Sequence, residues 1–382
     1  MVAKNYFTHL RRLMMTIGIW KVYEPGVSKL RRNIYRVYAI SFQLVCYSAM
    51  VSLVGEMPSL VKTDPVAAMD SANRFIVYIV IIIKMFIWQS ERMVKLLDAA
   101  LEQNSAIRKS SESDPVVSRI YESHIRLNNT VMSLLVTSGT SVAVTIFAVG
   151  DVNLYRFVQS SNGTDVTIKP LPHKYWYPFD KDRHYLIALV DQHVRPTLSC
   201  FCIGVISASI NSLTIFVKVQ LRVLQHQFRG RWERGALRSL KLLCSRHQRL
   251  IRHVSDFNQS LKYVILLEYT VSSLTFALLI LQITAGEQLT INFTILVLTT
   301  LQLLTFSWNS NEIILQSMEL ASALFRSNWY TQDRPVKVLI HIMMMRCQKP
   351  LSLRIAWLGV MDLNAGMSRL KLGYSYTSVV KN

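Results

Sequence analysis

The residues nearest the end of the chain place charged side chains inside a long, otherwise apolar stretch. Asp362, Arg369 and Lys371 lie within residues 351–380, and Ser375 follows them. A helix of this length can cross a bilayer at about 1.5 Å rise per residue. Because a charge facing lipid costs roughly 3 kcal/mol or more, this helix must be packed inside protein or line a water-filled path.

Elsewhere the sequence carries no pattern typical of catalysis, and it contains no phosphate-binding loop, nucleophile triad or metal-ligand cluster. The cysteines lie mostly in apolar runs or basic loops, and the spacing of Cys200 and Cys202 is not that of a zinc site. The three methionines at 343–345 favour soft packing over a metal site. We therefore predict that the chain is not an enzyme and has neither a cofactor nor a bound metal.

The composition indicates a membrane protein. The chain is 51% hydrophobic and 17% charged, whereas about a quarter of the residues in a soluble domain are charged. The net charge of +20 is concentrated in particular loops, which favours the positive-inside rule and anionic lipid headgroups over nucleic acid as its explanation. The first 20 residues lack a clean apolar core, so we expect no cleaved signal peptide.

Apolar runs predict an all-α fold with seven membrane-spanning helices. The expected spans are residues 34–54, 72–97, 124–149, 186–219, 263–284, 289–315 and 351–380. The basic N-terminus and the basic stretch at 218–262 share one side, and the acidic loop at 56–70 lies on the other. The N-terminus is therefore expected in the cytoplasm and the C-terminus outside the cell. The last span should be broken in two at Lys349-Pro350, and the basic stretch should continue as helix beyond the membrane.

Two charges inside apolar runs need partners. Lys84 interrupts the second span and could snorkel to the surface or pair inside the bundle. Glu312, near the inner end of the sixth span, is expected to pair with a basic residue.

Four motifs occur in order along the chain. The segment LPHKYWYPFD at 171–180 resembles the second extracellular loop of insect odorant receptors. In this chain, Ser310-Asn311-Glu312 together with Asn328-Trp329-Tyr330 is similar to the junction between the sixth and seventh spans of those receptors. Gln348-Lys349-Pro350 is similar to the break in their seventh span, and Tyr374-Ser375-Tyr376 to their terminal signature. The resemblance covers the whole chain.

This resemblance implies an odorant-gated, non-selective cation channel in the plasma membrane of olfactory neuron dendrites. Four subunits would surround a central pore, and this chain would be a ligand-tuning subunit assembled with the odorant-receptor co-receptor. The co-receptor has a long insertion that the short connection at 218–262 lacks. The expected regions are 1–217, which holds the ligand pocket, the basic extension 218–262, the anchor 263–350, and the pore-lining residues 351–382.

The resemblance also implies an odorant pocket in the extracellular half of the second, third, fourth and sixth spans. The residues that match this depth are Val77, Tyr78 and Ile81 in the second span, Val144 and Phe147 in the third, Cys202 and Ile206 in the fourth, and Phe293, Leu296 and Val297 in the sixth. Apolar residues of membrane helices more often pack or face lipid, so the alternative for every one of them is plain packing.

The family closes its pore with an apolar residue three positions after the second tyrosine of the signature, which is Val379 here. Leu372, Ser375 and Asn382 share its helical face, and a ring of apolar side chains dewets a narrow pore. Asn162 heads a glycosylation sequon in the long loop that the charge pattern places outside.

Two other classes remain as alternatives. A secondary transporter would show inverted repeats, and we find no internal repeat. A G-protein-coupled receptor would have the opposite orientation, and the chain lacks the sequence D-R-Y at the end of the third span.

Overall fold

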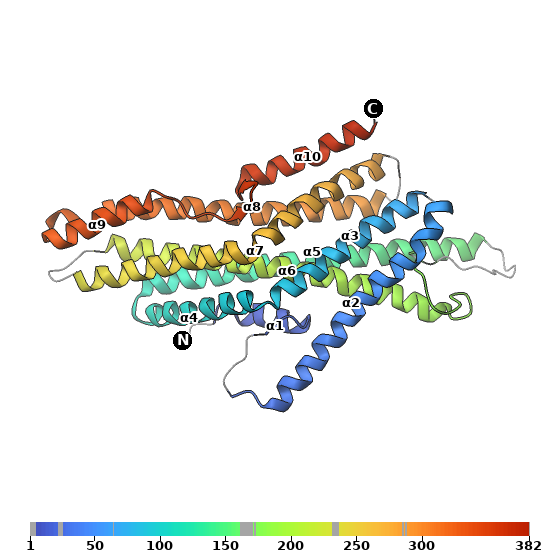
Figure 1. Ribbon diagram of the computed structural model, residues 1–382, viewed down its shortest axis with the longest axis horizontal. Helices are drawn as coiled ribbons and strands as arrows, with labels where there is room; N and C mark the ends of the chain where they lie inside the picture. The colour runs from blue at the N-terminus through green and yellow to red at the C-terminus, as the bar shows by residue number, and fades with distance from the viewer. Residues whose placement is uncertain are drawn as a thin grey trace.

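The computed structural model describes residues 5–21, 26–63, 65–160, 171, 173–230, 237–284, 286 and 289–381, most of them in helices (Figure 1). The helices are α1 (Thr8–Thr16), α2 (Lys29–Thr63), α3 (Pro65–Trp88), α4 (Glu91–Ser113), α5 (Pro115–Ser160), α6 (Tyr185–Arg229), α7 (Leu237–Thr284), α8 (Leu289–Phe325), the 3-10 turn η1 (Trp329–Thr331), α9 (Arg334–Cys347) and α10 (Leu363–Lys381). Two short antiparallel strands, β1 (Arg354–Ile355) and β2 (Gly359–Val360), precede α10.

Six helices of the described chain are long and apolar enough to cross a membrane, namely α2, α3, α5, α6, α7 and α8. The helices α6 and α7 have 45 and 48 residues, or about 70 Å at 1.5 Å per residue, against a hydrocarbon thickness of about 30 Å. Their surplus lies at the end of the bundle that also holds α9 (Figure 1). We call this the α9 end, and the opposite end, with residues 173–184, the loop end.

The helix α6 lies at the centre of the bundle. Its apolar segment is 83% buried, and α1, α2, α3, α5, α7 and α8 all contact it. A Cβ at Gly139 of α5 would lie 2.5 Å from the carbonyl oxygen of Cys200, and one at Gly204 of α6 would lie 2.9 Å from that of Leu135. Since side chains do not fit at such distances, glycine lets the two backbones pack directly against each other.

The basic stretch after the fourth span is helical, as the sequence predicts, but residues 218–262 do not form an element of their own. The helix α6 continues through the first of them to Arg229, and α7 runs from Leu237 without a break into the fifth span. Leu240, Leu250 and Val254 are buried at helical spacing, so the part of α7 at the α9 end packs on a protein core.

Three predicted boundaries are wrong. The described residues 56–63 and 65–70 are helical rather than a loop, because α2 continues to Thr63 and Pro65 starts α3 at a position that favours proline. The second span ends at Trp88 rather than residue 97, because the side chain of Ser90 accepts a hydrogen bond from the Met93 N–H and so begins α4. The sixth span extends to Phe325.

The last span is broken near Lys349-Pro350 as predicted, but residues 351–362 do not continue it as helix. They form the β1–β2 hairpin, with Gly359 at a φ of +125°, a conformation that favours glycine. The Asp362 carboxylate accepts a hydrogen bond from the Ala365 N–H at 2.7 Å and so caps α10. The helix α10 has 19 residues, packs against α7 and α8, and points toward the loop end (Figure 1).

Candidate functional site

A cavity of about 210 Å³ lies between α3, α5, α6, α7 and α8 near the loop end. Its apolar wall includes Val77 and Ile81 of α3, Ile146 of α5, Ile203 of α6, Leu279 of α7 and Ile295 of α8. An enclosed apolar wall with a few polar groups is the usual form of a small-molecule site.

Polar side chains reach the cavity at two depths. Toward the loop end they include Arg74 and Tyr78 of α3 with His173 and Tyr175 of the loop, and deeper in the bundle Thr299 and Gln302 of α8. Further polar residues of the wall are Asn73, Ser199, Thr275, Gln282 and Asn292. An Arg74 Nη1–H donates to His173 Nδ1 at 2.6 Å. Burial, reinforced by the charge of Arg74, holds the pKa of His173 well below its usual range, so this ring is neutral.

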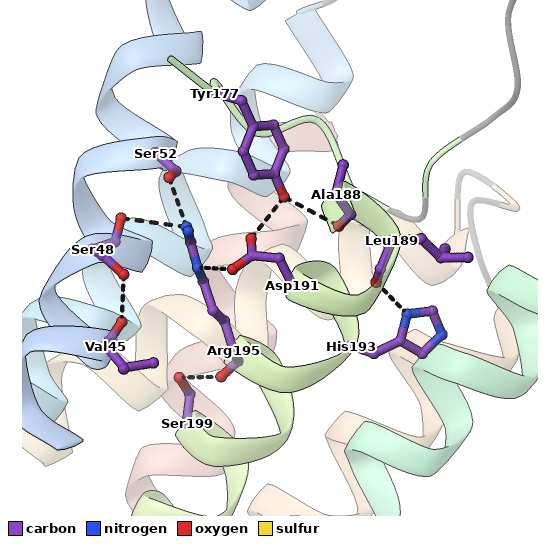
Figure 2. A network of polar contacts seen from close by, with 10 residues as sticks. All are labelled: Val45, Ser48, Ser52, Tyr177, Ala188, Leu189, Asp191, His193, Arg195 and Ser199. Carbon is purple, nitrogen blue, oxygen red and sulfur yellow. Dashed lines mark hydrogen bonds and ion pairs between the residues drawn. The ribbon is translucent and has the colours of Figure 1, made fainter. Parts of the chain in front are cut away.

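The loop that covers the cavity is held by a polar network (Figure 2). Arg195 of α6 lies 2.6 Å from an oxygen of Asp191 and donates to the Ser52 hydroxyl of α2 at 2.7 Å. The Tyr177 hydroxyl donates to the other Asp191 oxygen at 2.8 Å. Burial first, and then Asp191, raise the pKa of Tyr177, so its hydroxyl stays protonated and donates. The network therefore fixes the loop against α2 and α6.

A second, smaller cavity of about 50 Å³ lies beside the deeper end of the first cavity and is also lined by α10, since Thr299 and Gln302 line both cavities and Arg369 lines the smaller one. Its wall includes Glu268 of α7 and Arg369 of α10. The Arg369 guanidinium donates to the carbonyl oxygen of Glu268 and lies over the Tyr269 ring, 5.4 Å from its centroid. Arg369 is thus packed inside protein, whereas Lys371 is exposed.

Both charges that the sequence singled out have partners. Lys84 Nζ of α3 lies 3.2 Å from a Glu268 oxygen, so it pairs inside the bundle and does not snorkel. Glu312 of α8 lies 3.1 Å from Lys218 Nζ of α6. For Lys84 the structure selects the second of the two predicted alternatives, and the predicted pairing of Glu312 is confirmed. Each pair joins two helices that are far apart in sequence.

Three of the residues predicted to contact ligand, Val77, Tyr78 and Ile81, line the cavity together. On α6 the predicted Cys202 and Ile206 are fully buried in the core and lie outside the cavity wall. Pro196, Ser199, Cys200 and Ile203 line the cavity from that helix. Cys202 lies between the lining residues Cys200 and Ile203 along the helix, on another face of α6.

The predicted residues on α5 and α8 also lie outside the cavity wall. Val144 of α5 is 64% exposed and Phe293 of α8 is 60% exposed, both on the outer surface of the chain. On α8, Val297 is also exposed and Leu296 is half-buried. On α5, Phe147 stacks on His193 with 4.5 Å between the ring centroids. The neighbouring lining residues are Val142 and Ile146 on α5, and Ile291, Asn292, Ile295 and Leu298 on α8. Both helices are apolar around much of their circumference, so periodicity could not select the face.

Sequence reasoning did not assign His173 and Tyr175 to the cavity, although both belong to the loop motif that it recognised. Leu372 and Ser375 are exposed on α10. Val379 belongs to α10, but its side chain lies outside the described residues, as do Asn382 and Asn162.

The family model described as 7tm Odorant receptor matches residues 64–374. The chain belongs to this family of odorant receptors. The family predicted from the four motifs is therefore confirmed, and the all-α, multi-pass membrane fold agrees with it. Odorant receptors are receptors rather than enzymes, and the match favours this interpretation over the transporter and G-protein-coupled alternatives.

Curated relatives and solved structures agree with the family. Odorant receptor 10 of Aedes albopictus is 27% identical over 44% of this chain and 48% of its own length. Odorant receptor 30a of Drosophila melanogaster is 25% identical over 52% of this chain and 54% of its own length. The match thus spans about half the length of these curated odorant receptors.

The olfactory receptor OR5 from Machilis hrabei in complex with eugenol superposes with a TM-score of 0.76 and 14% identity over 99% of this chain and 98% of that structure. The structure of the same receptor described without eugenol superposes with a TM-score of 0.77. The identity is 13% over 98% of this chain and 97% of that structure. At this identity the likeness concerns the fold.

Proposed function

We propose that this odorant receptor binds small, largely apolar volatile molecules in the 210 Å³ cavity near the loop end. The observation that carries the proposal is a mainly apolar cavity between five helices, with polar side chains in its wall, in a member of the odorant receptor family. The related receptor from Machilis hrabei is described in complex with eugenol, a small molecule of this kind.

We further propose that the chain is a ligand-tuning subunit of a heterotetrameric, non-selective cation channel formed with the odorant-receptor co-receptor. Lys371 and Tyr374 of α10 are exposed on this single chain, and such side chains need water or neighbouring subunits inside a membrane. In this arrangement α10 crosses the membrane as the seventh span, the N-terminus is cytoplasmic, and the C-terminus and Asn162 face the outside of an olfactory neuron dendrite.

The assembly is tested by recording currents from cells that express this chain alone, the co-receptor alone, or both, during exposure to a panel of volatiles. We expect ligand-evoked cation current only from cells with both proteins, and staining of a C-terminal epitope without permeabilisation. Robust odorant current from this chain in cells free of co-receptor would contradict the assembly.

The gate is proposed at Val379, whose apolar side chains would form a dewetted ring in the closed pore. Val379→Gln is expected to raise the current without ligand and to change ion selectivity, because a polar ring holds water. Val380→Gln, on the adjacent helical position about 100° away, is the matched control and should change neither. Unaltered leak and selectivity in Val379→Gln would place the gate elsewhere.

A further inference from the structure

The cavity wall toward the loop end holds a buried hydroxyl whose proton lacks an acceptor among the described residues. Tyr175 is 2% exposed and lines the cavity. Among the residues that the structure describes, this hydroxyl has no acceptor for its proton, and the neighbouring Tyr78 hydroxyl acts on it as a donor. Leaving a buried donor unsatisfied is unfavourable, and an acceptor on a bound molecule would remove that cost.

A second donor lies beside it. The ring centroids of His173 and Tyr175 lie 5.6 Å apart. The backbone N–H of His173 donates to the Gln192 side-chain oxygen at 2.8 Å, which fixes this part of the loop. Arginine can only donate, so the 2.6 Å contact from Arg74 makes His173 Nδ1 an acceptor. A neutral imidazole that accepts at Nδ1 carries its proton on Nε2, which assigns His173 a donor at that atom.

The same part of the wall carries a positive charge. Arg74, whose guanidinium is a cation, lines the cavity. The nearby Asp191 carboxylate is already bound by Arg195 and Tyr177 in the network that holds the loop. A carbonyl lone pair is attracted to the charge of Arg74, whereas a protonated amine has no lone pair to offer the Tyr175 hydroxyl.

We propose that the ligand of this cavity carries a carbonyl oxygen, as in a ketone, ester or lactone, and that this oxygen accepts a hydrogen bond from Tyr175. The positive charge of Arg74 and the donor of His173 lie beside that oxygen. The apolar body of the ligand then packs on Val77, Ile81 and Ile295 deeper in the cavity. This inference rests on the proposed odorant-binding function and adds the chemical class of the odorant.

The test compares ligands of one shape and different chemistry on cells that express the chain with the co-receptor. Two skeletons are used, a linear methyl ketone and acetophenone, each with the isostere that replaces C=O by C=CH₂ and with the corresponding amine. The wild type should respond to the ketone at a concentration about 3- to 10-fold lower than to its isostere, as expected for one hydrogen bond. The amine should be weaker than the ketone.

Tyr175→Phe keeps the ring and removes only the hydroxyl. It should bring the potency of the ketone to that of its isostere and leave the isostere unchanged. Tyr155→Phe, an exposed tyrosine of α5 outside the cavity, is the matched control and should preserve the difference. Equal potency of ketone and isostere in the wild type overturns the proposal, and so does a ketone preference that survives in Tyr175→Phe.

Thermal stabilisation of the purified chain by the same compounds separates this proposal from the proposed channel. If no compound evokes current but the ketone stabilises the wild type more than its isostere, and Tyr175→Phe does not show this preference, the ligand class stands and the channel function fails. If neither skeleton stabilises the chain or evokes current, both are wrong.

Discussion

Glu268→Gln is expected to remove most of the correctly folded receptor, because it leaves the charge of Lys84 without a partner in the core. The Lys84 side chain is 6% exposed and its Nζ lies 3.2 Å from the Glu268 carboxylate. Removing one member of a buried ion pair costs about 3–5 kcal/mol. Since the Glu268 side chain is 31% exposed, we expect the lower end of this range, which is still a large part of a typical folding free energy.

Surface expression and thermal unfolding of the detergent-purified chain measure this effect. The matched control is Glu319→Gln, which breaks the exposed pair between Glu319 and Arg229 with its 2.8 Å contact and should cost no more than about 1 kcal/mol. Exchanging the two charges, in Lys84→Glu with Glu268→Lys, should recover part of the lost stability. Similar unfolding temperatures for Glu268→Gln and Glu319→Gln would show that the Lys84 pair contributes little.

The same pair links the candidate ligand cavity to α10. Lys84 lies one helical turn after the cavity residue Ile81 on α3. The Glu268 carboxylate pairs with Lys84, and the Glu268 backbone carbonyl oxygen accepts a hydrogen bond from Arg369. A variant that folds but lacks the pair should therefore alter the response to ligand as well as stability. This response is recorded in the fraction of Glu268→Gln receptor that reaches the cell surface, and the charge-exchanged variant, which restores a pair, should recover part of the wild-type response.

Gly139→Val is expected to separate α5 from α6 and to abolish ligand responses. The new Cβ would lie 2.5 Å from the Cys200 carbonyl oxygen, and a backbone atom cannot rotate away as a side chain could. Overpacking of this kind costs about 1–3 kcal/mol, and a rigid neighbour favours the upper end. Valine regains only a few tenths of a kcal/mol of helix propensity over glycine. Gly139 also lines the cavity, so the substitution reduces its volume.

Thr137→Val is the control for this substitution. It introduces the same side chain on the same helix at an exposed position and should leave expression, thermal unfolding and ligand responses unchanged. Thermal unfolding of both purified variants measures the difference. Equal stability of the two would mean that α5 and α6 can separate locally at little cost.

The sequence by itself determined the membrane class and most of the helices. A backbone in hydrocarbon must satisfy its own hydrogen bonds, so long apolar runs can only be helices there. The same reasoning predicted that Glu312 pairs and that Lys84 either pairs or snorkels, because an isolated charge in lipid is costly. The loop and C-terminal motifs identified the family, and Lys349-Pro350 marked the end of α9.

Only the tertiary structure decided which face of each helix lines the cavity. Val144 and its neighbours Val142 and Ile146 are all apolar. Because successive residues of a helix are rotated by about 100°, Val144 faces outward while Val142 and Ile146 line the cavity. Local sequence also could not name Glu268 as the partner of Lys84, since the two meet through the packing of α3 on α7. The hairpin at 351–362 escaped prediction because its apolar residues also fit a helix, and burial of Leu353 and Ile355 against the core decided between the two.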